Sequence, residues 1–264
     1  MQPNVAVKVR DLVVTYGSVV AVNGLSFEVR RGEIYGLLGP NGAGKSSTIK
    51  TLVGLVEASS GEARIFGHPL TDETTVKNLT GYVPEDAVLF DSLTPREFLE
   101  FVASVRRLPS ADVNAKLSQM VKAFRLEPYF DSIIATLSLG TKQKVAVIAA
   151  LLHDPPLLIL DEPLSGLDAR TSRILKELVG LHARKGSAVI FCTHVMEVAE
   201  RLCTRVGIIN NGRMVGEGTI DELRTLVHSH ESLEDIFLKV TAEEAGIEET
   251  IRALEGSGNG QDLL

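Results

Sequence analysis

The chain has 264 residues and a formal net charge of −7, from 27 Lys and Arg against 34 Asp and Glu. This length allows one or two domains with a large core, and the 2 cysteines show neither a disulfide framework nor a metal-binding spacing. The acidic balance disfavours nucleic acid as a partner, and the most apolar run, residues 145–152, is much shorter than the ~20 residues of a membrane-spanning helix. We therefore expect a soluble intracellular protein that does not itself insert into a membrane.

The N-terminal segment is rich in β-branched and aromatic side chains. Apolar residues alternate over residues 5–9, and residues 12–16 and 26–29 have strand-like composition, with the turn-forming pair Asn23-Gly24 before the last of these segments. We expect these strands to form an antiparallel β-subdomain.

A glycine-rich loop follows a strand expected over residues 34–38 and precedes a helix expected over residues 45–56. The loop reads GPNGAGKS and matches the pattern G-x-x-x-x-G-K-[ST]. Glycines let backbone N–H groups surround phosphate oxygens, while Lys45 can reach the β- and γ-phosphates and Ser46 can ligate Mg²⁺. A glycine-rich turn without this function would not require Lys45 and Ser46. The expected nucleotide-binding residues here are Gly39, Asn41, Gly42, Ala43, Gly44, Lys45, Ser46 and Ser47.

Two carboxylates follow a buried strand expected over residues 157–160. In phosphate-loop proteins an acid at this place holds the Mg²⁺ shell, and a second carboxylate can orient the attacking water. We assign the first role to Asp161 and the second to Glu162, although a strand that ends in an acidic turn would have the same sequence. His194 follows the next strand, expected over residues 188–192, where it could sense a γ-phosphate.

The remaining segments are predicted mainly from capping and periodicity. Thr94, Pro95 and Glu97 indicate a helix start within a helical segment of about residues 93–134. Further elements are expected as helices over 111–125, 169–183 and 195–202, a hairpin at Asn211-Gly212, and a disordered tail from Glu255.

The order of these motifs resembles the ATP-binding cassette (ABC) ATPases over about residues 5–220. Residues 137–143, LSLGTKQ, are similar to the family's signature, and residues 165–168, SGLD, are similar to its D-loop. The resemblance implies roles at the nucleotide for Ser138, Gly140 and Asp168, and makes His194 the switch histidine. Tyr16 lies where the family stacks an aromatic ring on adenine, although a half-buried strand tyrosine would look the same.

The implied fold is an α/β phosphate-loop NTPase core with an N-terminal antiparallel β-subdomain and an inserted α-helical subdomain. We expect the ATPase domain over residues 1–220, the helical insertion over about residues 90–155, and a C-terminal extension over residues 221–264. The last residues of the extension are expected to be disordered.

Two departures from the family pattern concern the signature and one neighbouring loop. Leu139 and Thr141 stand where the family usually has Gly and Gln. Glu85 stands where a Gln usually approaches Mg²⁺ and relays to the membrane partner, so Glu85 could ligate the metal or face that partner. These departures, with a weaker similarity over residues 232–237, resemble the exporter branch whose ATPases pair with a separate six-helix permease.

The resemblance implies that the chain binds ATP and Mg²⁺ and forms an ATP sandwich with a second ATPase subunit, identical or paralogous. It would drive a transmembrane permease from the cytoplasmic face of the cell membrane. Phe90, Phe98 and Phe101 are candidates for the permease contact, or simply core aromatic residues of the insertion. Two alternatives stay open: a non-transport ABC ATPase and a weakly hydrolysing regulatory module.

Overall fold

Two β-sheets organise the chain in the computed structural model, which describes residues 4–226 and 232–241. The antiparallel sheet has the order β2 (Val19–Arg30), β1 (Val5–Tyr16), β4 (Ser60–Ile65) and β5 (His68–Pro69). The larger sheet has the order β10 (Arg213–Gly218), β9 (Arg205–Asn210), β3 (Ile34–Leu38), β8 (Ala188–Thr193), β7 (Leu157–Asp161) and β6 (Thr80–Val83). Its strands are parallel apart from the β9–β10 hairpin.

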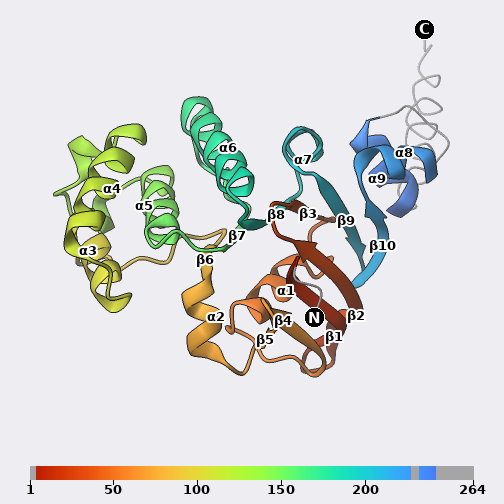
Figure 1. Ribbon diagram of the computed structural model, residues 1–264. Coiled ribbons are helices and arrows are strands. Elements are labelled where there is room, and N and C mark those ends of the chain that lie inside the picture. The colour runs from red at the N-terminus through yellow and green to blue at the C-terminus, as the bar shows by residue number, and fades with distance from the viewer. Residues whose placement is uncertain (1–3, 227–231, 242–264) are drawn as a thin grey trace, which may run out of the picture.

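Helices surround the sheets, and Figure 1 shows three of them, α3 to α5, grouped on the side away from the antiparallel sheet. The helices are α1 (Lys45–Leu52), α2 (Glu73–Leu79), α3 (Pro95–Val105), α4 (Ser110–Ala123), α5 (Leu139–Leu151), α6 (Ala169–Arg184), α7 (Met196–Leu202), α8 (Ile220–Leu226) and α9 (Leu233–Thr241), with 3-10 turns at Glu127–Tyr129 and Ile134–Thr136. The α/β architecture with a separate antiparallel sheet and a helical group confirms the expected fold class.

The central strands β3, β7 and β8 of the larger sheet are buried on both faces. Along β7, Leu157 and Ile159 pack in one apolar cluster with Ile49 of α1. Leu158 and Leu160 lie in a second cluster that includes residues of α3 to α6. Because side chains alternate between the faces of a strand, the next residue after Leu160 projects toward α1 and the phosphate loop.

The predicted turn at Asn23-Gly24 is wrong. This pair lies within β2, and the chain reverses instead at Gly17-Ser18, between β1 and β2. Gly24 has φ 74°, and the pairing of β1 with β2 shifts register beside it, so the glycine forms a β-bulge. A turn-forming dipeptide such as Asn-Gly is compatible with both a β-bulge and a hairpin turn, so the dipeptide alone does not distinguish them.

The helix starts follow the sequence more closely than the helix ends. Thr94 and Glu97 form the predicted capping box of α3. The helix after the phosphate loop ends at Leu52 rather than at residue 56, because Gly54 adopts a left-handed φ of 75°. Helices α8 and α9 were not predicted. The expected disordered tail from Glu255 lies outside the described residues.

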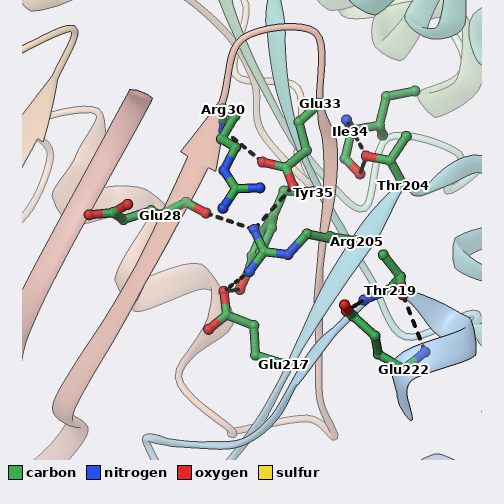
Figure 2. Close-up of polar contacts among 10 residues, drawn as sticks. All are labelled: Glu28, Arg30, Glu33, Ile34, Tyr35, Thr204, Arg205, Glu217, Thr219 and Glu222. Carbon is green, nitrogen blue, oxygen red and sulfur yellow. Dashed lines mark hydrogen bonds and ion pairs between the residues drawn. The ribbon is translucent and has the colours of Figure 1, made fainter. Parts of the chain in front are cut away.

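A charged cluster joins the two sheets at the amino end of β3, as Figure 2 shows. Arg205 forms ion pairs with Glu33 at 3.1 Å and with Glu217 at 2.7 Å. The hydroxyl of Tyr35 donates to Glu217 at 3.0 Å, and burial together with this carboxylate raises the pKa of Tyr35 well above its usual range. A further bond runs from the Arg205 guanidinium to the carbonyl of Glu28 on β2. These partners tie the antiparallel sheet to β3, β9 and β10.

Candidate nucleotide-binding site

A hollow of about 520 Å³ lies at the carboxyl ends of β3 and β7. Ligands of open α/β sheets bind in crevices at this end of the strands. Its lining residues are Tyr16, Ala21, Asn41, Gly42, Ala43, Gly44, Lys45, Ser46, Ser47, Glu85, Glu162 and His194. All of these except Ala21 are residues that the sequence predicts for the site, so the fold brings distant motifs together.

The conformation of the phosphate loop depends on glycine, and the Lys45 side chain occupies the space within the loop. Gly44 has φ 104°, and a Cβ atom there would lie 2.4 Å from the carbonyl oxygen of Ala21. The buried Lys45 ammonium donates to the carbonyl oxygens of Gly39 at 2.7 Å and Pro40 at 3.0 Å. These neutral acceptors leave the charge of Lys45 uncompensated within the loop, which favours an anionic ligand.

The tip of the β9–β10 hairpin supports this loop from behind. Gly212 donates its N–H to the carbonyl of Ala43 at 2.9 Å and accepts from the N–H of Asn23 at 2.8 Å. The sequence predicts the hairpin itself but gives no signal for its contact with the loop, because that contact joins segments far apart in the chain. The sequence also does not predict Ala21 as a lining residue of the hollow, because it too lies far from the phosphate loop along the chain.

Asp161 is a buried carboxylate with an unpartnered oxygen. Its exposed fraction is 2%, and its Oδ1 atom has no hydrogen-bond partner among the described residues. Burial raises its pKa, and the negative charges of Glu85 and Glu162 act in the same direction, while the neighbouring polar groups of Ser46 and Cys192 oppose them. A buried carboxylate in this state is stabilised by a cation.

Glu162 is held in a strained conformation by partners at the end of β8. Its φ is 44°, which is rare for a residue other than glycine, and its N–H donates to the carbonyl of Cys192 at 3.0 Å. One carboxylate oxygen accepts from the hydroxyl of Thr193 at 3.1 Å, and the other lies 2.7 Å from Nδ1 of His194. The predicted Glu162 and His194 therefore form a single hydrogen-bonded unit at the hollow.

The residues present fit a magnesium nucleotide better than a protein-only metal site. No group of three or more His, Cys, Asp or Glu side chains that could hold a metal ion occurs in the described part of the chain. Ser46 and Asp161 could supply two oxygen ligands, and Mg²⁺ usually takes one or two protein oxygens together with phosphate oxygens and waters. The unpartnered Oδ1 of Asp161 agrees with such a ligand set.

Ser138, Gly140 and Asp168 do not line the hollow. Ser138 caps α5, and a Cβ atom on Gly140 would lie 2.3 Å from the carbonyl oxygen of Gly166, so the signature and the D-loop pack against each other. Asp168 caps α6, where the N–H and hydroxyl of Thr171 lower its pKa to about 2. Each of these residues therefore has a local structural role, and its role at the nucleotide stays a prediction.

The structure also places the residues that depart from the family pattern. The Thr141 hydroxyl lies 2.9 Å from that of Ser138 and so belongs to the cap of α5. Leu139 is 55% exposed beside this cap, whereas Glu85 is exposed at the edge of the hollow. Tyr16 is also exposed, which leaves its ring available for stacking.

A glycine-rich loop before a helix, with a lysine and a neighbouring buried carboxylate, defines a phosphate-loop nucleotide-binding protein. The family model described as "ABC transporter" matches residues 22–165, and a model described as "AAA domain, putative AbiEii toxin, Type IV TA system" matches residues 132–200. The first match covers more than half of the chain. The chain therefore belongs to the ABC transporter ATP-binding family.

Similar proteins share this family. The chain is 36% identical over 219 residues to the probable multidrug ABC transporter ATP-binding protein YbhF of Escherichia coli (strain K12), a match that covers 83% of this chain and 38% of that protein. It is 35% identical to the Nod factor export ATP-binding protein I of Rhizobium meliloti (strain 1021), over 82% of this chain and 65% of that protein. The chain thus spans less than two thirds of the length of these relatives.

A solved structure described as the ATP binding subunit of an ABC transporter has the same fold. Its TM-score is 0.86 at 36% identity, and the match covers 89% of this chain and 99% of that chain. Within the described residues, no helix is both long enough and apolar enough to cross a bilayer.

Proposed function

We propose that the chain is the ATP-hydrolysing subunit of an ABC exporter, which dimerises on ATP and drives a separate transmembrane permease. The observation that carries this proposal is the hollow itself. It joins the phosphate loop to a Glu162–His194 unit, and the carboxylate of Asp161, whose Oδ1 has no hydrogen-bond partner among the described residues, lies beside Ser46. A protein that only bound a nucleotide would not need a strained, hydrogen-bonded carboxylate at the same place.

Each residue acts through the contacts described above. The ammonium of Lys45 exchanges its two loop carbonyls for β- and γ-phosphate oxygens. Ser46 and Asp161 hold Mg²⁺, which neutralises phosphate charge when bound. Glu162, fixed by Thr193 and His194, orients the attacking water toward the γ-phosphate. Tyr16 stacks on the base.

The site is completed by a second copy or a paralogue. Ser138 and Gly140 lie outside the hollow of their own chain, at the exposed start of α5. The N–H groups at this helix start can meet the γ-phosphate of a nucleotide bound to the partner. ATP then stabilises the closed dimer because it contacts both subunits only in that state.

Dimerisation is tested by light scattering of the purified chain with ATP and Mg²⁺. The Glu162→Gln variant should form a stable dimer because it binds ATP and hydrolyses it slowly, whereas Lys45→Ala should remain monomeric. A Lys45→Ala chain that dimerises on ATP would contradict the sandwich. An ATPase assay on the wild-type chain, alone and with membranes, separates an active transporter subunit from a regulatory module.

The surface proposed for the permease lies around Glu85 and an exposed aromatic group. The ring of Phe90 packs edge-on against those of Phe98 and Phe101, at 5.9 and 5.5 Å between centroids. Phe98 is half-buried and also serves the core, but Phe90 and Phe101 are 52% and 47% exposed, and Val88 is 86% exposed. Exposed apolar side chains gathered in this way are typical of an interaction surface.

The same surface is connected to the signature helix. Gln143 of α5 donates to the carbonyl of Pro84 at 3.3 Å, and Lys142 forms an ion pair with Asp91 at 2.9 Å. These contacts fasten the two ends of the Glu85 loop to α5, whose first turn carries Ser138 and Gly140. A permease that moves this loop would therefore move the residues proposed to contact the partner's ATP.

The docking surface is tested by co-purification with membranes. Val88→Glu and Phe101→Glu should release the chain from the membrane fraction, whereas Val215→Glu, at an exposed position on β10, should not. Retention of both variants on membranes would contradict the surface. The outward direction of transport and the cytoplasmic face are supported by Glu85 and Leu139, which resemble the exporter branch, and by the names of the multidrug and Nod factor relatives.

A further inference from the structure

Helix α6 has a basic and apolar side that faces away from the sheet. Thr171, Leu175 and Val179 are buried in the core, so the opposite side of the helix is turned outward. A groove of about 350 Å³, which we call the α6 groove, runs along this outward side. Three arginines and three aliphatic side chains line it, namely Arg170, Arg173, Arg184, Ile174, Leu178 and Leu181.

The arginines of the α6 groove lack carboxylate partners in the part of the chain that the structure describes. Arg173 and Arg184 make no ion pair or hydrogen bond there, and the guanidinium of Arg170 donates only to the neutral carbonyl of Ala123, at 3.4 Å. Among the residues that line the groove, Glu177 alone is acidic. Unpaired cations beside exposed apolar side chains fit a partner that is both acidic and apolar.

A segment with this chemistry follows α9 in the same chain. Residues 242–255, which we call the acidic segment, read AEEAGIEETIRALE and lie outside the described residues. They hold five glutamates against a single arginine, Arg252. Their apolar residues Ile247, Ile251 and Leu254 follow one another at intervals of four and three, a spacing typical of one face of a helix.

The pattern of the acidic segment is complementary to that of the α6 groove. The three aliphatic side chains of the groove have the same intervals of four and three. In the groove two arginines precede the aliphatic residues and one follows them, and in the segment two glutamates precede the apolar residues and one follows them. The one acid of the groove, Glu177, has its counterpart in Arg252, the one base of the segment. Opposite charges therefore meet when the two apolar stripes are aligned in the same direction.

The chain passes beyond the described residues within reach of α6. Helices α6, α7 and α9 share one apolar cluster, and Figure 1 shows α7 between the other two. The carbonyl of Thr241 accepts from Nδ2 of Asn210 at the carboxyl end of β9, and α6 likewise follows the carboxyl end of its strand, β7. Packed helices lie about 8–10 Å apart, so two steps from α9 to α6 measure about 20 Å, which six extended residues span. Ile247 is the sixth residue after Thr241.

We propose that the acidic segment binds along the α6 groove of its own chain. Its apolar residues cover Ile174, Leu178 and Leu181, and its glutamates pair with the arginines. This contact goes beyond the proposed function, because it lies outside the nucleotide-binding hollow. It joins the C-terminal extension to the helix that Asp168 caps.

The test uses the absence of tryptophan from the sequence. Leu254→Trp places a single indole in the acidic segment of the full chain, and its quenching by acrylamide is measured without nucleotide. The indole should be shielded, with blue-shifted emission, because it lies against the groove. Adding Arg173→Glu and Arg184→Glu replaces two ion pairs by like-charge contacts, so the binding constant of the segment should fall about 10-fold and the indole should become accessible.

A matched control changes the total charge by the same amount elsewhere. Arg10→Glu with Arg64→Glu, at side chains 58% and 44% exposed on the antiparallel sheet, should leave the indole shielded. Glu244→Lys with Glu255→Lys should restore shielding in the chain whose groove arginines have been replaced, because opposite charges then meet again. Thermal unfolding verifies that each variant is folded, and Arg173→Gln with Arg184→Gln supplies the comparison should the glutamate variant fail to fold.

Three results would overturn the inference, and none of them involves ATP, so the proposed function is tested separately. An indole as accessible in the Leu254→Trp chain as in a free tryptophan peptide would show that the segment is not bound. Equal exposure in the α6 variant and in the antiparallel-sheet control would show that total charge, rather than the groove, holds the segment. Shielding that is lost on dilution of the protein would assign the segment to the groove of a second copy.

Discussion

The nucleotide-binding hollow and the Arg205 cluster are both charged, and they lie at opposite ends of β3, but they differ in how completely their charges are paired. At the amino end, Arg205 meets Glu33, Glu217 and a backbone carbonyl (Figure 2). At the carboxyl end, the hydrogen bonds of Lys45 run to neutral carbonyls, and among the described residues Oδ1 of Asp161 has no hydrogen-bond partner. The paired charges stabilise the folded chain, whereas the unpaired charges favour the binding of a ligand of opposite charge. Substitutions at the amino end of β3 should therefore lower stability, whereas substitutions at the carboxyl end should lower activity.

The largest expected effect is on activity at the carboxyl end. Glu162→Gln keeps the size and the hydrogen bond to Thr193 but removes the negative charge that we propose orients the attacking water, so ATP turnover should fall by about 10²–10⁴-fold. ATP affinity should be unchanged, because Lys45 and the phosphate loop are intact. The measurement is steady-state phosphate release beside equilibrium nucleotide binding. Hydrolysis at the wild-type rate would remove Glu162 from this role.

The largest expected effect on stability is at the amino end. Arg205→Met leaves Glu33, which is 8% exposed, as a poorly paired carboxylate, and should lower the free energy of unfolding by about 3 kcal/mol. Lys8→Met provides the control, because Lys8 and its partner Glu28 are 40% and 36% exposed, and the loss there should stay below about 1 kcal/mol. Urea unfolding without nucleotide measures both. Equal losses of unfolding free energy in Arg205→Met and Lys8→Met would show that the Arg205 cluster stabilises the fold no more than an exposed ion pair does.

A half-buried histidine, His153, tests whether the amino ends of the strands tolerate an unpaired charge. His153 lies between α5 and β7, where burial and then the charge of Arg106 lower its pKa from 6.5 to about 4. Between these values the unfolded chain binds a proton that the folded chain does not, so stability should fall as the pH decreases from 6.5 to 4 and stop falling below that. After allowance for partial exposure, the loss is about 2 kcal/mol.

The measurement for His153 is urea unfolding at several pH values. His153→Gln should flatten the pH dependence in this window. His182, whose pKa burial also lowers, keeps its own contribution in both proteins, so the difference between them isolates His153. An unchanged slope in His153→Gln would show that the folded protein accommodates the charge.

The two ends also differ in how far the sequence predicts them. The phosphate loop, Asp161 and Glu162 form local motifs, and the structure gathers the loop and Glu162 with Tyr16, Glu85 and His194 around one hollow. The Arg205 cluster was not predicted, because its partners lie on separate strands and no short pattern relates them. The turn at Asn23-Gly24 was wrong for a related reason, since only the pairing with β1 distinguishes a bulge from a hairpin.

The smallest expected effect gives the clearest contrast, because here the sign of the stability change reverses. Asp161→Asn replaces a buried carboxylate, whose pKa burial raises, by a neutral amide of the same shape. Without nucleotide the variant should be more stable than the wild type by about 1 kcal/mol, since the desolvation cost of the charge is removed. With ATP and Mg²⁺ the order should reverse, because only the carboxylate gains a cation. Thermal unfolding of both proteins, with and without the magnesium nucleotide, measures the crossing. A variant that is less stable than the wild type in both conditions would place Asp161 among the paired, structural charges of Arg205 and its partners.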